Sequence, residues 1–180
     1  MHKTSNILRF IQFTLLVSII ATANASQPQP GELDNFVLWS IGAKLDTLSP
    51  KQLEESLKRF KVSAEETYGD KRYRFFRGYP HFIDGVFKFR YERSGEDKPK
   101  IPWNLLDASF YFPGLSQADV QQLINKLENK LGKPAGSKQN DIILAKRWML
   151  GEFIELSLRV DKEVGDVGLT YSVLQGDMPF

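Results

Sequence analysis

Two segments of the chain carry apolar residues at helical spacing directly after a serine. Ser49 and Ser116 each follow a leucine and have a side chain suited to capping a helix N-terminus. In the second segment Gly132 and then Pro134 follow the last apolar residue, which is a common way for a helix to end. The apolar positions are Leu53, Leu57 and Phe60 in the first segment, and Val120, Leu123, Ile124, Leu127 and Leu131 in the second. This spacing predicts two amphipathic helices, of which the first is the shorter.

Strand patterns surround both helices. Residues 85–92 and 151–160 alternate apolar and polar side chains, as a strand with one buried face does. In the first of these segments Phe87, Phe89 and Tyr91 share one face, and Lys88, Arg90 and Glu92 share the other. Apolar runs at 36–41 and 108–112 predict a further strand before each helix.

The helices and their strands recur at a nearly constant spacing. The two serine caps are 67 residues apart, and Gly85 and Gly151, which open the alternating strands, are 66 residues apart. We interpret this as two tandem strand–helix–strand–strand repeats, one at about 36–92 and the other at about 107–174. Short turns between successive strands make them antiparallel, and both helices are expected to cover one face of the sheet. The expected fold class is α+β.

The first 25 residues have the pattern of an export signal. Lys3 and Arg9 precede an apolar run of eleven residues, and residues 23–25 form an Ala-Asn-Ala cleavage site. A membrane anchor is the alternative, but a spanning helix needs about 20 apolar residues. Removal of residues 1–25 leaves one domain, 26–180, with 22 basic and 22 acidic residues. Because the chain also has no cysteine, we expect a periplasmic protein that neither spans the membrane nor binds nucleic acid.

The order of these features resembles a known architecture. Its elements are the leader, an aromatic strand pattern, the serine-capped helices, a helix end at Leu131-Gly132-Lys133-Pro134, then Trp148 and a last hairpin. Over most of residues 33–175 this layout is similar to exported bacterial proteins of tandem helix-plus-sheet repeats, the β-lactamase-inhibitor-protein-like family, and to uncharacterised periplasmic families. The resemblance implies that the chain binds another protein or takes part in envelope assembly. It assigns no site residue, because the inhibitor's contact residues and its disulfides have no counterpart in this sequence.

The residues of common catalytic and metal sites are scarce. His81 is the one histidine outside the leader, and it lies in a segment, 77–82, whose glycine and proline favour a loop. The sequence has no Gly-x-Ser-x-Gly elbow and no phosphate-binding glycine motif. Residues 161–166 are acidic but lack the length and closing glutamate of a calcium loop, so we interpret them as a hairpin turn. We therefore predict no enzyme activity, no catalytic or metal-binding residue and no cofactor. An unrecognised hydrolase that uses His81 or a carboxylate is the alternative.

One part of the chain is rich in aromatic and basic residues. Residues 68–112 hold 13 of the 20 aromatic residues outside the leader. Aromatic residues in strand patterns are expected in the core, whereas the segments 61–84 and 94–106 are expected to be inserted loops, where binding residues collect. The predicted binding patch, at one end of the sheet, consists of Arg72, Arg74, Arg77, Tyr79, His81, Phe82 and Trp103. We expect it to bind an envelope or extracellular protein. A small ligand, an anionic lipid or a glycan bound through residues 71–103 is the alternative.

Overall fold

The computed structural model describes residues 31–93 and 102–174. Its helices are α1 (Glu32–Gly42), the short 3-10 helix η1 (Leu45–Thr47), α2 (Pro50–Lys58) and α3 (Gln117–Leu131). Its strands are β1 (Val62–Gly69), β2 (Tyr73–Pro80), β3 (Val86–Glu92), β4 (Asn104–Phe112), β5 (Gly136–Gln139), β6 (Ile143–Met149), β7 (Ile154–Asp161) and β8 (Val167–Val173). The expected α+β class is confirmed. The predicted leader and most of the predicted loop 94–106 lie outside the described residues.

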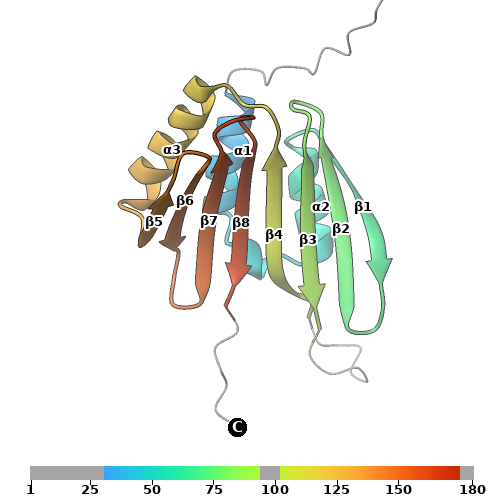
Figure 1. Cartoon of the computed structure of the whole chain (residues 1–180). Helices are drawn as coiled ribbons and strands as arrows, with labels where there is room; N and C mark the ends of the chain where they lie inside the picture. Colours follow the sequence, from blue (N-terminus) through green and yellow to red (C-terminus); the bar gives the residue numbers. More distant parts are fainter. Residues whose placement is uncertain (1–30, 94–101, 175–180) are drawn as a thin grey trace, which may run out of the picture.

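The eight strands form one antiparallel sheet in the order β1-β2-β3-β4-β8-β7-β6-β5. Figure 1 shows this sheet as a continuous layer with the helices behind it. The first four strands are neighbours in chain order, and so are the last four. The two groups meet in the middle of the sheet, where β4 pairs with β8 and Ser109 lies opposite Thr170. The last described strand therefore occupies a central position, with strands on both sides.

The segment 36–41, which the sequence pattern predicts as a strand, belongs to helix α1. The buried residues of α1 are Leu33, Phe36, Val37 and Ser40, and their spacing is that of one helical face. A short apolar run does not distinguish a buried strand from a buried helix. The helical period becomes visible only when the run is started at Leu33, three residues earlier. The prediction of a strand before the first capped helix is therefore wrong.

The hydrophobic core lies between the helices and the sheet. Phe36 of α1 stacks on Phe87 of β3, with ring centroids 4.5 Å apart, and meets Phe110 of β4 edge-on. Helices α2 and α3 contribute to the same cluster through the buried residues Leu53, Leu57, Leu123, Ile124 and Leu127. The alternation predicted for β3 is confirmed, because Phe87, Phe89 and Tyr91 are buried whereas Lys88 and Arg90 are exposed.

The predicted serine caps are confirmed. Ser49 and Gln52 form a capping box, in which the Ser49 hydroxyl accepts from the Gln52 N–H and the Gln52 side chain accepts from the Ser49 N–H. The Ser116 hydroxyl accepts from the Asp119 N–H at 3.2 Å. Gly132 follows α3 with a φ of 79°, a conformation that favours glycine at a helix end.

Replacing Ser116 by alanine is expected to lower the free energy of unfolding by about 1 kcal/mol. The reason is that an N–H group in the first turn of α3 loses its partner. Urea-induced unfolding followed by circular dichroism measures the loss. Ser137→Ala is the matched control, because Ser137 is exposed on the edge strand β5, and it should change stability by less than about 0.5 kcal/mol. Equal losses in the two variants would contradict the capping role.

Residues 61–84 are not an inserted loop. Most of them form the hairpin of β1 and β2, in which Glu65 lies opposite Arg77. The sequence of β2 does not alternate simply between apolar and polar residues, because Phe75 and Phe76 are adjacent and point to opposite faces of the sheet. The alternation pattern therefore does not identify this strand. Gly78 is buried within β2, where an added Cβ would lie 3.0 Å from a Val62 methyl group. The interpretation of 161–166 as a hairpin turn is confirmed, since this segment joins the paired strands β7 and β8.

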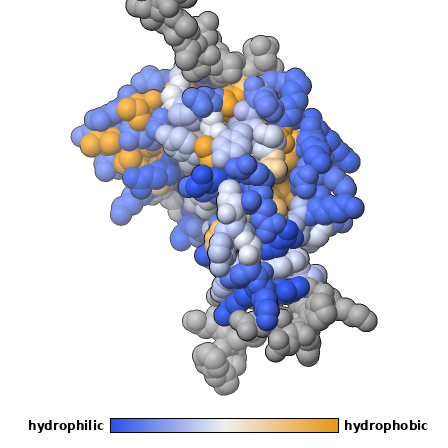
Figure 2. Space-filling view, turned by 90° about the vertical axis from the view of Figure 1, so that its right-hand side faces the viewer, coloured by the Kyte–Doolittle hydropathy of each residue, from blue (hydrophilic) through white to orange (hydrophobic). Residues whose placement is uncertain are grey.

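The β1 edge of the sheet is polar. All residues from Glu65 to Gly69 are exposed on this strand, and a register shift between Glu66 and Tyr68 interrupts its pairing with β2. Figure 2, which faces this edge, shows mainly hydrophilic residues. Charges and bulges on an edge strand discourage the addition of a strand from another chain. Within residues 31–93 and 102–174, no helix has the length and apolar character needed to cross a membrane.

Candidate functional site: the open face of the sheet

The face of the sheet that points away from the helices carries an excess of basic side chains. We define this open face by the three rows of cross-strand partners that pass through Asp107, Ser109 and Tyr111 on β4. The strand pleat places alternate residues there, so that Arg159 of β7 is exposed between two buried neighbours. The basic residues of the open face are Arg77, Lys88, Arg90, Lys138, Arg147 and Arg159, and the acidic ones are Glu65, Asp107 and Glu155.

The middle row of the open face crosses all eight strands. From β1 to β5 its residues are Glu65, Arg77, Lys88, Ser109, Thr170, Ser157, Arg147 and Gly136. Side chains directly opposite each other on antiparallel strands have Cβ atoms about 5 Å apart, and like charges in such a pair are destabilising. Arg77 and Lys88 form such a pair. Glu65, on the other side of Arg77, accepts a hydrogen bond from the Tyr79 hydroxyl at 3.2 Å.

Two of the arginines on the open face are neutralised locally. The Arg90 Nε atom lies 2.6 Å from an Asp107 carboxylate oxygen. The Arg147 Nη1 atom lies 3.5 Å from a Glu155 carboxylate oxygen. The other four basic residues have no ion pair with any residue in the described ranges; they are Arg77, Lys88, Lys138 and Arg159. The open face therefore has positive charge available for a partner.

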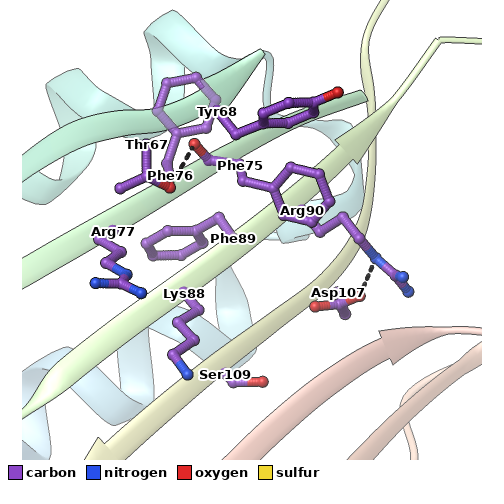
Figure 3. Close-up of a pocket in the computed structure, with 10 residues that line it drawn as sticks. All are labelled: Thr67, Tyr68, Phe75, Phe76, Arg77, Lys88, Phe89, Arg90, Asp107 and Ser109. Atoms are coloured by element: carbon purple, nitrogen blue, oxygen red, sulfur yellow. Dashed lines mark hydrogen bonds and ion pairs between the residues drawn. The ribbon is translucent and has the colours of Figure 1, made fainter. Parts of the chain in front are cut away.

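A shallow hollow of about 560 Å³ lies on the part of the open face formed by β1 to β4. Figure 3 shows Arg77, Lys88 and Ser109 along one side of it, and Tyr68 and Phe75 along the other. Two cations beside a hydroxyl group can hold a carboxylate or a phosphate. The aromatic rings offer apolar contact area to a partner next to that anion.

The residues predicted as one binding patch are not brought together. Of the seven, Arg77 and Tyr79 lie on the same face of β2, and both are exposed. Phe82 is only 4% exposed, and its ring centroid lies 6.1 Å from that of Phe36 of α1. Phe82 is therefore part of the core, because the chain turns under α1 directly after β2.

Arg72 and His81 lie beyond opposite ends of β2. They are nine positions apart in the sequence, which corresponds to roughly 30 Å of extended strand. The Arg72 guanidinium forms an ion pair with Glu92 at 2.8 Å. The His81 side chain is exposed, and its backbone N–H donates to the Lys61 carbonyl oxygen.

Arg74 and Trp103 form a separate cluster on the other side of the sheet from Arg77. The Arg74 guanidinium lies 5.5 Å from the Trp103 ring centroid, and Arg93 lies 4.8 Å from the same ring. Arg74 also donates to Glu66, and this hydrogen bond lowers the pKa of the Glu66 carboxyl group. These contacts join the ends of β2, β3 and β4, so we assign Arg74 and Trp103 to the scaffold rather than to the open face.

The basic residues of the open face that the predicted patch omits are Lys88, Arg90, Lys138, Arg147 and Arg159. Lys88 and Arg90 occupy polar positions of an alternating strand, so the sequence pattern itself marks them as exposed. Arg147 and Arg159 belong to strands far away in sequence, and no local signal indicates that they share a face with Arg77. In the described part of the chain, no group of three His, Cys, Asp or Glu side chains is placed to hold a metal ion.

No protein-family model, no curated protein and no solved structure matches this chain. The function proposed below therefore depends on the open face itself.

Proposed function

We propose that this protein is a non-catalytic periplasmic binding module whose open face binds an acidic surface of an envelope or extracellular protein. The observation that carries the proposal is the pair Arg77 and Lys88, two like charges placed directly opposite each other and without an ion pair to a described residue. An acidic partner would remove this repulsion, so complex formation relieves an unfavourable feature of the free protein. The periplasmic location is inferred from the leader pattern.

The size of the open face supports a protein partner. Seven strand spacings of about 4.8 Å and strands of about seven residues give an area of roughly 34 by 24 Å. About 800 Å² per partner is typical of a stable protein–protein interface. Exposed arginine and tyrosine side chains, such as Arg77, Tyr79 and Tyr111, are the types that contribute most to binding at such interfaces.

A small anionic ligand, lipid headgroup or glycan is the second candidate. The hollow beside Arg77 favours a small ligand, because the aromatic rings of Tyr68 and Phe75 offer surfaces there on which a ligand can stack. Small-molecule sites, however, enclose about 70–90% of their ligand. A shallow hollow on a sheet surface encloses much less, so the protein partner is preferred.

We also propose that the domain is a duplication, with its helices on one face of the sheet. The unit differs from the strand–helix–strand–strand repeat expected from the sequence, since it is a helix followed by four strands. One copy is α2 with β1 to β4, and the other is α3 with β5 to β8. The strand order supports this proposal, because β1 to β4 form one half of the sheet, β5 to β8 form the other, and β4 pairs with β8 where they meet.

The single variant Lys88→Glu is expected to be more stable than the wild type and yet to bind its partner at least tenfold more weakly. The new carboxylate would lie opposite Arg77, and a pair of opposite charges there is worth about 0.2–1 kcal/mol. The same change removes positive charge from the hollow. Capture of proteins from an envelope extract, followed by mass spectrometry and affinity measurement on the captured partner, tests the binding. Urea unfolding tests the stability.

The control is Lys51→Glu on α2, which makes the same charge change at an exposed site away from the open face. It should bind the partner like the wild type. The double variant Arg77→Glu/Lys88→Glu should lose the partner altogether. Retention of the partner by the double variant would refute the proposal. The second candidate would be supported instead if the wild type captured no protein but bound vesicles containing phosphatidylglycerol, and the double variant lost this vesicle binding.

A further inference from the structure

The two halves of the sheet are related by an approximate twofold axis at the Ser109–Thr170 pair. Along the middle row, steps outward from Ser109 lead to Lys88 and then Arg77. Steps outward from Thr170 in the other direction lead to Ser157 and then Arg147. Because β4 and β8 are antiparallel, the axis exchanges β2 with β6 and β3 with β7. Arg77 and Arg147 therefore occupy equivalent positions.

A second pair of arginines obeys the same relation. Arg90 follows Lys88 by two residues on β3, and Arg159 follows Ser157 by two residues on β7. The residues that precede them, Phe89 and Leu158, are both buried. Each half of the open face thus presents one arginine on its second strand and one on its third.

Each half also carries a hollow. The first, of about 560 Å³, lies on β1 to β4, and the second, of about 600 Å³, lies on β5 to β7. The second hollow is lined by Lys138, Arg147 and Arg159, among others. Each hollow contains two basic residues without an ion pair to a described residue: Arg77 and Lys88 in the first, and Lys138 and Arg159 in the second.

The middle of the open face, where the two hollows approach each other, is rich in hydroxyl groups. Ser109, Thr170 and Ser157 occupy the middle of the central row. Two carboxylates in this region, Asp107 and Glu155, already form ion pairs with Arg90 and Arg147, and a third, Asp166, accepts a hydrogen bond from the Tyr111 hydroxyl. The centres of the two hollows are four to five strand spacings apart, which is about 20 Å.

We propose that the open face is a two-site receptor for a protein surface with two acidic clusters about 20 Å apart. Arg77 and Lys88 bind one cluster, and Lys138 and Arg159 bind the other, while the hydroxyl groups between them contact a neutral polar region. This inference rests on the proposed function, and it adds the spacing and the number of the charged groups on the partner. Binding at two linked sites raises affinity without any new contact, provided that the spacing fits.

Three blocked peptides test the spacing on the whole protein at low ionic strength. The first has three glutamates, and the second has six consecutive glutamates, whose two halves are centred about 10 Å apart. The third has two groups of three glutamates joined by a Gly/Ser linker of about 13 residues, whose average span is about 20 Å. Fluorescence anisotropy is expected to show the third peptide binding about tenfold more tightly than the second, although their charges are equal.

Charge reversal in one hollow at a time measures the contribution of each site to binding of the spaced peptide. Arg77→Glu/Lys88→Glu and Lys138→Glu/Arg159→Glu should each reduce binding of the spaced peptide to the level of the three-glutamate peptide. The control Lys51→Glu/Lys133→Glu reverses two exposed charges away from the open face and should bind like the wild type.

Equal binding of the second and third peptides, or an unchanged affinity in Lys138→Glu/Arg159→Glu, would overturn the two-site inference. If Arg77→Glu/Lys88→Glu still loses the envelope partner in that case, the proposed function stands with one site. If that variant keeps the envelope partner, the proposed function fails as well.

Discussion

Phe36→Ala is expected to lower the free energy of unfolding by about 3–5 kcal/mol. Phe36 is fully buried, and its ring centroid lies between 4.5 and 6.1 Å from those of five other aromatic residues. These neighbours are Trp39, Phe60, Phe82, Phe87 and Phe110. Their rings belong to α1, to the segment after α2, to the loop after β2 and to the strands β3 and β4, so they cannot all move to fill the cavity. Because small domains are stable by only about 5–15 kcal/mol, this loss is a large share of the total.

Leu38→Ala is the informative control for Phe36→Ala. In a strand, Phe36 and Leu38 would share one face and both substitutions would be severe. In helix α1 they point in different directions, and Leu38 is 37% exposed. We therefore expect Leu38→Ala to cost at most about 1 kcal/mol. Urea unfolding of both variants, followed by circular dichroism, gives the comparison, and equal large losses would contradict the helix.

Gly165→Ala is expected to lower the free energy of unfolding by about 3 kcal/mol. Gly165 has a φ of 75°, a conformation in which alanine is strained. An added Cβ would also lie 2.2 Å from the Leu115 carbonyl oxygen, which belongs to the backbone and cannot rotate away. A hydrogen bond holds the two backbone segments together at this point, because the Leu115 N–H donates to the Gly165 carbonyl oxygen at 2.8 Å. Relief of the clash would break this hydrogen bond between the β7–β8 turn and the start of α3.

Gly114→Ala separates the cost of the backbone conformation from the cost of the steric clash. Gly114 also has a positive φ, of 61°, but no atom within 4 Å of the position of an added Cβ. Its substitution should therefore cost only the conformational part, about 1 kcal/mol. Thermal or urea unfolding measures both variants. A Gly165→Ala loss no greater than that of Gly114→Ala would show that the contact with Leu115 adjusts easily.

The candidate site was partly visible in the sequence. Arg77 and Tyr79 were correctly placed together because they are two residues apart in one segment. Lys88 was correctly expected on the polar face of its strand. Phe82 was wrongly expected at the surface, because the glycine and proline of the segment 77–82 suggested a loop, whereas the turn after β2 carries its ring under α1. The burial of Phe82 against Phe36 and the pairing of Arg77 with Lys88 each depend on two separate segments, so neither can be seen in one segment alone.

Local sequence alone specified the elements whose signals lie within a few residues. The caps and apolar faces of α2 and α3, and the alternation along β3 and β7, depend on neighbours one to four residues away. The tertiary structure decided which strands are adjacent, and therefore which charges meet. Pairing of β4 with β8 joins residues about 60 positions apart and brings Arg77 and Arg147 into one row. Such contacts depend on the packing of the whole core, so no short window of sequence contains them.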